Sequence, residues 1–416
     1  MLSVLRNSYQ RNARLSISYF VLRSVGSHHF HTWLRKRFLV QERLDSGQLQ
    51  YFKLQKCDFR TTQHLCIPPI MTLLLRPVLH IGAALMGRTI KKWWARKSKE
   101  EKEEYKQWYR ERRNMFLGCF GFYGLMLFTY YITHFKTDPL TQRSRFIIFN
   151  KEQERDLGKR LHELQLEIYK KNIVPPDHPA YKRILRAFRR LIVANKDLKS
   201  MRETKWNLTV IDIPLMNSFT LPDGSIFVSL DLLRYIENDD QLEFLLAHEM
   251  AHSLLSHSLE MMSDQFLLDL LIAVPILLVW FTFPDMAAAI VHTIGDRITK
   301  IVYELPYNRV LENEADEVAI KLSAKACIDL REAVVFWATL RTLTEMEVLP
   351  SEIPWVSSHP SHGDRENNIN KAMIKALEMR RDSGCPELPA VDPRTKFYER
   401  SAREQMIHFR RRGIIV

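Results

Sequence analysis

The spacing of apolar positions changes several times along the chain after residue 150. Apolar side chains recur every three to four residues in 151–172 and again in 180–195, which predicts two amphipathic helices separated by the breaker IVPPDHP. Residues 206–213 alternate between apolar and polar, as a half-buried strand does. Two β-rich runs then meet at Asp223 and Gly224, a pair typical of a hairpin turn. The pattern predicts an α+β fold that is mainly helical and contains a small β-sheet.

Another helix is predicted to begin within the segment ENDDQLEFLLAHEMAH. Asp240 is placed to cap this helix, and Glu243 follows three residues later, as in a capping box. The same helix then carries His248 and His252.

Two further apolar stretches precede these elements. Residues 114–135 form 22 consecutive positions without a formally charged side chain, and a transmembrane helix needs about 20. A buried core helix fits this stretch poorly, because a densely charged run precedes it. Residues 66–87 are interrupted by three prolines and by Arg76, so we expect a packed or surface-associated segment there and not a second span.

The positive charge of the chain is confined to two places. Residues 1–40 hold seven Lys and Arg and no acidic residue, and residues 88–113 hold eleven Lys and Arg against five Glu. Together these stretches carry a net charge equal to the +13 of the whole chain, so the remainder is neutral in sum. This distribution indicates targeting and membrane topology and argues against a nucleic-acid partner.

Residues 1–40 have the composition of a mitochondrial transit peptide, because they are rich in Arg, contain Ser and lack acids. Arginines interrupt every stretch that could serve as a secretory signal, and a disordered basic tail would rarely carry so many Leu, Val and Phe. The positive-inside rule then predicts a basic segment on the matrix side at 41–113 and one transmembrane helix at 114–135. Residues 136–416 would face the intermembrane space.

The chain has five cysteines and no CxxC motif, which argues against a disulfide scaffold or a cysteine-ligated metal. Any metal should therefore be held by His and carboxylate groups. Within the sequence HEMAH, His248 and His252 are four residues apart, so both imidazoles leave one face of a helix. That spacing suits one zinc ion, and Glu249 then points toward its water molecule. The alternative is a core helix that happens to carry histidines.

A catalytic zinc site needs three protein ligands and one open position. The continuation HxxGxxH fails here, because Leu255 and Ser258 occupy the positions of its Gly and His, and His257 is one residue out of register. The segment NRVLENEADEVAI offers Glu312 as a distant ligand. Asp316 lies four residues later on the same helical face and could accept a hydrogen bond from a ligand histidine. Alone, this segment would be interpreted as an acidic, solvated helix face.

At this point the chain resembles the membrane gluzincins of the HtpX and CAAX-prenyl-protease type. The resemblance rests on Glu-x-x-Ala-Asp (Glu312 to Asp316) downstream of HExxH, on the edge-strand segment 217–229 and on the His-Pro motif with Arg in 357–365. It covers roughly residues 150–370. Two small departures, Asn308 and Ser218, stand where the family often has Ser and Ala. With the leader and the single span, the chain is similar to the OMA-type metalloendopeptidases of the mitochondrial inner membrane.

The resemblance implies a gluzincin-like metallopeptidase domain at 136–416 with one zinc per subunit. Its ligands would be His248, His252 and Glu312, Glu249 would be the general base, and Asp316 would support a ligand. His359 and Arg365 would lie near the substrate, and either could stabilise the developing oxyanion. Residues 217–221 would pair with an extended peptide.

The implied activity is the cleavage of inner-membrane proteins in quality control and stress response, including the dynamin-like fusion GTPase. The bilayer would be a further partner, and a homo-oligomer is compatible with this interpretation. Two alternatives remain: an inactive membrane scaffold of the same fold, and a prenyl-protein-type protease of another membrane.

Residues 270–284 are uncharged, contain Pro275, and lie between the two halves of the proposed zinc site. A single crossing here would separate His252 from Glu312, and residues 285–307 are too charged for a return span. We therefore expect this segment to contact the membrane or to be buried in the protein. Cys327 and Cys385 share a compartment with the site, so they could pair in the intermembrane space or remain as buried free thiols.

Overall fold

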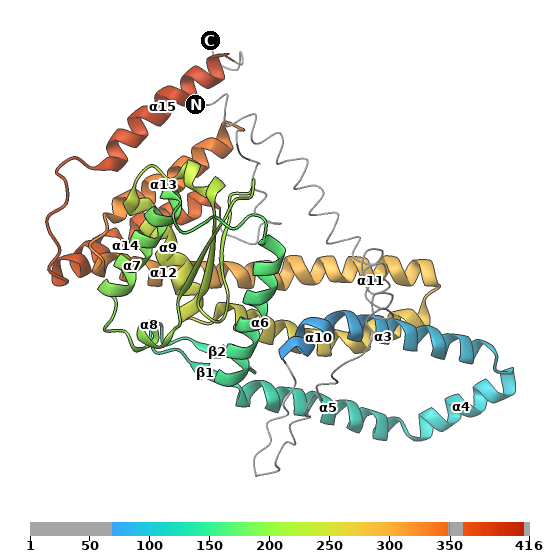
Figure 1. The fold of residues 1–416 in the computed structure, drawn as a ribbon. Helices are drawn as coiled ribbons and strands as arrows, with labels where there is room; N and C mark the ends of the chain where they lie inside the picture. Colours follow the sequence, from blue (N-terminus) through green and yellow to red (C-terminus); the bar gives the residue numbers. More distant parts are fainter. Residues whose placement is uncertain (1–68, 348, 350–360, 412–416) are drawn as a thin grey trace, which may run out of the picture. The chain divides into compact units, whose positions relative to one another are not determined.

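The chain divides into two compact units, Met1–Ile67 and Pro68–Val416. A computed structural model describes residues 69–347, 349 and 361–411 of the second unit (Figure 1). The predicted transit peptide 1–40, the first part of the segment 41–113, and His359 lie outside the described residues.

The described chain begins with three helices, of which the last is the predicted span. These are α3 (Pro69–Ala95), α4 (Lys99–Glu111) and α5 (Arg113–Thr133). Ser98 begins α4 with a complete capping box, in which the side chain of Glu101 accepts from the backbone N–H of Ser98. Along α5, only Leu127 is buried. Among the described residues, α5 and α10 (His257–Thr282) are long and apolar enough to cross a membrane.

Two small sheets follow α5. The first pairs β1 (Phe135–Thr137) with β2 (Ser144–Phe146). The second has the strand order β3-β5-β4, with β3 (Asn207–Ile211) parallel to β5 (Ser225–Ser229) and β4 (Ser218–Thr220) antiparallel to it.

The predicted strand and hairpin are thus confirmed. Gly224, in the turn between β4 and β5, has φ +88°, which favours glycine. β5 is buried throughout, and β4 forms an edge of the sheet.

Helices make up most of the remaining chain, so the mainly helical α+β prediction is confirmed. They are α6 (Lys151–Tyr169), α7 (Pro179–Ala194), α8 (Lys199–Glu203), η1 (Leu230–Tyr235), α9 (Asp239–Leu254), α10, α11 (Asp285–Thr299), η2 (Lys300–Glu304), α12 (Leu305–Lys325), α13 (Leu330–Glu345), α14 (His362–Asp382) and α15 (Pro393–Arg411). Leu161 and Tyr169 of α6 pack against Phe227 of β5. Helix α9 contacts β4, α12 and α13, so it lies between the sheet and the C-terminal helices (Figure 1).

The predicted cap of α9 is wrong by two residues. Asn238 is the cap, because its extended backbone lets its side-chain oxygen accept from the N–H of Gln241 at 3.0 Å. Asp240 lies inside the first turn and accepts from the N–H of Asp329. Glu243 does not complete a capping box, because it is buried and its carboxylate faces Arg190 Nη1 at 3.2 Å.

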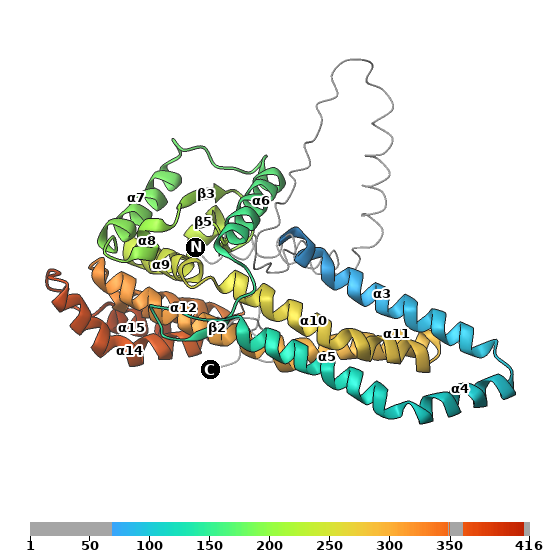
Figure 2. The ribbon, with the colours of Figure 1, turned by 90° about the horizontal axis from the view of Figure 1, so that it is seen from below.

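A long helical hairpin separates the two halves of the chain that meet at the site. Helix α10 continues through Pro275, so the segment 270–284 is the second half of this helix and the two residues after it. Helix α3 packs along α10, and α11 runs back beside it toward α12 (Figure 2). Residues 69–87 of the segment 66–87 belong to α3, which packs on α10 and leaves Val78, Ile81 and Leu85 exposed, so the helix is packed on one side and remains a candidate for surface association. The chain leaves along α10 and returns along α11, which allows Glu312 to reach His248 and His252.

One disulfide, between Cys327 and Cys385, is present in the structure. It ties the end of α12 to the segment after α14. Of the two alternatives for these cysteines, the bridge is therefore confirmed and the pair of free thiols is wrong.

Candidate metal centre

Helix α9 is largely buried near its C-terminal end, where the two histidines lie. His248 is 4 % exposed, and the turn around it includes the fully buried Ala247, Met250 and Ala251. One helical turn separates His248 from His252, so their Nε2 atoms converge to 3.1 Å. The sequence spacing therefore produces two imidazole donors at one point.

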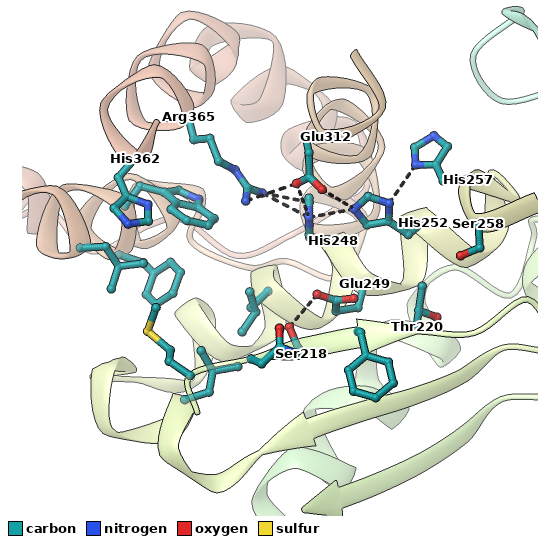
Figure 3. A pocket seen from close by; sticks show the side chains of 18 of the residues that line it. Ser218, Thr220, His248, Glu249, His252, His257, Ser258, Glu312, His362 and Arg365 are labelled. Carbon is teal, nitrogen blue, oxygen red and sulfur yellow. Dashed lines mark hydrogen bonds and ion pairs between the residues drawn. The ribbon is translucent and has the colours of Figure 1, made fainter. Parts of the chain in front are cut away.

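Glu312 completes this group from α12 (Figure 3). Its Oε2 lies 3.3 Å from His248 Nε2, and its Oε1 lies 3.6 Å from His252 Nε2. Ligands of a tetrahedral zinc ion, at about 2.0–2.2 Å from the metal, are about 3.4 Å apart. The three donors therefore fit one zinc ion, and they are the two imidazoles and one carboxylate that zinc prefers in an open site.

Asp316 and Arg365 support His248 from behind. Asp316 Oδ1 lies 3.0 Å from His248 Nδ1, so this carboxylate can accept from an Nδ1–H when Nε2 binds a metal. Arg365 of α14 donates to both oxygens of Asp316, at 2.8 Å from Nε and 2.5 Å from Nη2. Its guanidinium stacks on Trp337 at 3.7 Å from the ring centre. This planar contact and the bidentate pair hold Arg365 in one orientation.

The electrostatics of this group favour a cation. Burial and the charge of Arg365 lower the pKa of His248, but the carboxylates of Asp316 and Glu312 outweigh them and raise it to about 9. Burial and the charge of His248 together hold the pKa of His252 well below its usual value. His252 is therefore neutral, as a metal ligand must be.

Glu249 enters the same pocket from the sheet side of α9 (Figure 3). Ser218 of β4 donates a hydrogen bond to its Oε1 at 2.6 Å. Burial raises the pKa of Glu249, while His248 and Ser218 oppose the rise only in part. A carboxylate with a raised pKa is a stronger base than an exposed one, which suits general-base work near neutral pH. The cavity has a volume of about 360 Å³, and α9, α12, α13, α14 and β4 contribute to its wall.

The chain is similar to known proteins over the part that contains this cavity. The pattern described as "Peptidase family M48" matches residues 181–373. "Metalloendopeptidase OMA1, mitochondrial" of Danio rerio is 33% identical over 332 residues, which is 80% of this chain and 70% of the relative. The chain belongs to peptidase family M48. The protein of the same name from Bos taurus is 34% identical over 79% of this chain, and the chain covers 63% of that relative's length. "Mitochondrial metalloendopeptidase OMA1" of Saccharomyces cerevisiae is 28% identical over 64% of this chain.

The M48 match includes all the described residues that the sequence predicted for the site. The structure brings His248, Glu249, His252, Glu312 and Arg365 to one cavity, with Asp316 directly behind it. Arg365, however, uses Nε and Nη2 on Asp316. Its Nη2 also lies 3.0 Å from His248 Nδ1, and its Nη1 lies 3.6 Å from Glu312 Oε2. The geometry therefore favours Arg365 as a residue that positions Asp316 and the ligands. His359 lies outside the described residues.

Sequence reasoning missed His257, a further residue of this M48 centre. Its Nδ1 lies 2.9 Å from His252 Nδ1, and its Nε2 lies 3.1 Å from Glu314 Oε2. Glu314 in turn accepts from Arg143 and Arg145 at 2.8 and 2.7 Å. In the sequence, only the five-residue spacing from His252 hinted at this contact. Ser256, in the left-handed conformation at φ +53°, separates α9 from α10 and so allows His257 to turn toward His252.

Proposed function

We propose that this chain is a zinc-dependent endopeptidase of the mitochondrial inner membrane. The single observation that carries the proposal is the convergence of the donor atoms of His248, His252 and Glu312 beside the carboxylate of Glu249 in one cavity. Zinc would supply Lewis acidity there, which acidifies a water molecule and polarises a peptide carbonyl. The donor set of two imidazoles and one carboxylate supports zinc as the metal.

The residues of the chain provide proton transfer, ligand orientation and charge neutralisation. Glu249 accepts the proton of the attacking water and can pass it to the leaving amine. Asp316 and His257 face the Nδ1 atoms of His248 and His252 and so orient the two ligands. Arg365 neutralises Asp316, and the role of oxyanion stabiliser stays with the two candidates from the sequence, His359 and Arg365.

The substrate is proposed to bind as an extended strand along β4. This strand is an edge of its sheet, and Ser218, Phe219 and Thr220 line the cavity beside Glu249. An added strand would pair through its backbone, which demands little of the substrate's side chains. Such recognition suits an enzyme that removes diverse damaged proteins.

The helices before the site and the names of the relatives support a proposed location, and the substrates are proposed with it. The relatives are named mitochondrial, and α5 is an exposed apolar helix of spanning length. We place α5 in the inner membrane as an anchor, with the peptidase domain in the intermembrane space and with α3 and the α10–α11 helices, which pack on one another, within the bilayer beside α5. Substrates would be inner-membrane proteins cleaved in quality control and stress response, including the dynamin-like fusion GTPase. Protease accessibility of tags at residue 60 and at the C-terminus, in mitochondria with opened outer membranes, tests this orientation.

The test of the activity is the substitution Glu249→Gln. The amide keeps an oxygen that can accept from Ser218 and removes the base, so zinc content and folding should be retained. Cleavage of casein and processing of inner-membrane proteins should fall by about 10²–10⁴-fold. Glu317→Gln, on the exposed face of α12, is the matched control and should be fully active.

Two results would contradict the proposal. Cleavage by Glu249→Gln at the wild-type rate would refute the mechanism. A wild-type protein that binds zinc and cleaves nothing would support the inactive scaffold instead.

A further inference from the structure

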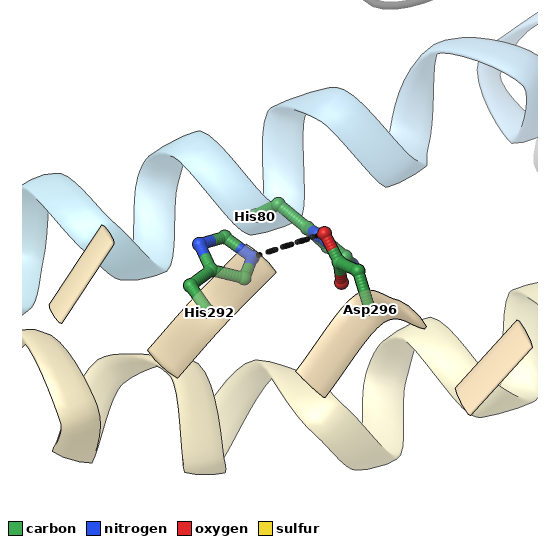
Figure 4. A group of neighbouring side chains, drawn as sticks. All are labelled: His80, His292 and Asp296. Carbon is green, nitrogen blue, oxygen red and sulfur yellow. Dashed lines mark hydrogen bonds and ion pairs between the residues drawn. The ribbon is translucent and has the colours of Figure 1, made fainter. Parts of the chain in front are cut away.

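A second group of possible metal ligands lies away from the peptidase site, between α3 and α11. It consists of His80 of α3 with His292 and Asp296 of α11 (Figure 4). His80 Nδ1 lies 3.4 Å from His292 Nε2, and Asp296 Oδ2 lies 3.7 Å from the same His292 nitrogen. One ligand atom of each residue lies within 4.8 Å of the other two.

The two groups are built in the same way. In each, one helix supplies two ligands four residues apart, His248 and His252 in α9 and His292 and Asp296 in α11, and a second helix supplies the third. Each set contains two imidazoles and one carboxylate. The separations of 3.4 and 3.7 Å are close to the 3.1 to 3.6 Å of the peptidase site and to the roughly 3.4 Å expected between ligands of tetrahedral zinc.

The surroundings of His80 add an independent feature of metal sites. His80 is 8 % exposed, and its Nε2, opposite the ligand nitrogen, faces the buried Asp269 Oδ1 at 3.5 Å. A histidine that binds a metal commonly directs its other ring N–H at a carboxylate, which fixes the tautomer. Gln265 donates to the same Asp269 oxygen at 2.8 Å and Arg76 lies 3.7 Å from it, so this carboxylate is itself held in place.

The other candidate occupant of the space between the two imidazoles is a proton. In that case His292 Nε2 donates to His80 Nδ1, and Trp280 donates to His292 Nδ1 at 3.4 Å. The distance between Trp280 Nε1 and His292 Nδ1 is longer than that of an ordinary N–H hydrogen bond, so losing this contact on metal binding would cost little free energy. A proton does not use Asp296, whereas a metal ion uses all three ligands.

We infer that His80, His292 and Asp296 bind a second divalent cation of the zinc type. The site joins α3 to the α10–α11 hairpin across more than 200 residues of sequence, so its role is to lock these helices together. Three protein ligands leave a fourth coordination position open, and Asp296, whose side chain is 41% exposed, lies on the accessible side of the group. The inference does not depend on the peptidase activity.

The experiment is a zinc count on the full chain, purified in detergent, stripped with a chelator and reloaded with zinc chloride. Wild type should hold two zinc ions per chain by elemental mass spectrometry. Asp296→Asn and His80→Ala should each hold one and still cleave casein at the wild-type rate. Thr293→Ala, an exposed neighbour on α11, is the matched control and should keep both ions.

A second measurement makes the assignment independent of any folding defect. Cobalt loaded in place of zinc should show two visible-absorption components in wild type, of which Asp296→Asn loses one and a His248→Ala and His252→Ala double variant loses the other. A wild-type chain that holds one zinc ion, with Asp296→Asn unchanged, would overturn the inference and leave the shared proton as the occupant.

Discussion

The pair formed by Asp316 and Arg365 allows a quantitative test of how the metal ligands are positioned. We consider the substitution Asp316→Asn, which preserves shape and removes the charge. Both side chains are at most 6% exposed and make two direct contacts. Removing one partner of such a buried pair costs about 3–5 kcal/mol. Arg365 retains its stacking on Trp337 and its 3.6 Å approach to Glu312, so we expect the lower end, about 3 kcal/mol.

Zinc affinity should fall as well, because the neutral amide of the variant can no longer accept strongly from His248 Nδ1. Loss of such a partner typically weakens metal binding by about 10–100-fold. Cleavage at saturating zinc should stay close to wild type, since Asp316 does not face the cavity. The assays are chelator competition for affinity, denaturant unfolding of the stripped protein for stability, and casein cleavage at several zinc concentrations.

Arg365→Met and the double variant separate positioning from catalysis. If Arg365 acts through Asp316, the double variant should lose less stability than the sum of the two single losses, and activity should recover with added zinc. An oxyanion donor behaves differently, since its removal lowers the rate by about 10²–10³-fold at any zinc concentration. Additive losses together with unchanged zinc affinity in Asp316→Asn would refute the reasoning.

Two further predictions concern stability. Replacing Cys327 and Cys385, which lie 58 positions apart, by Ser should lower the free energy of unfolding by about 4 kcal/mol, the loop-entropy value. Reductant should shift the urea midpoint of the wild type and leave that of the variant unchanged. Equal urea midpoints of the wild type with and without reductant would contradict the bridge. Burial raises the pKa of Glu243 to about 7, with Arg190 opposing the rise. The folded state thus holds a proton that the unfolded state loses near pH 4.5, and stability falls as pH rises between these values. Glu243→Gln should therefore be more stable than wild type above about pH 7, on the order of 1 kcal/mol, and equal to it near about pH 4.5; a constant difference across this range would argue against the raised pKa.

Local features of the molecule follow from the sequence because neighbouring residues determine them. The four-residue spacing of His248 and His252 places two imidazoles on one helical face wherever that helix packs. Asp223 and Gly224 specify the turn between β4 and β5, and the uncharged run that begins at Asn114 specifies an apolar helix. The cap of α9 shows the limit of such reasoning, since three polar residues compete and backbone geometry selects Asn238.

The sequence and the resemblance named Glu312 as a distant ligand, but only the tertiary structure shows how residues far apart in the chain meet at the two candidate metal groups. Glu312 reaches His248 because α10 and α11 form a hairpin that returns the chain, whereas the sequence indicated only that 270–284 could not cross the membrane alone. Arg365 lies on Asp316, His257 on His252, and His80 beside His292 for the same reason. Helical spacing acts over one turn, about 5 Å, but contacts between residues tens to hundreds of positions apart depend on how whole helices pack, which no local pattern encodes.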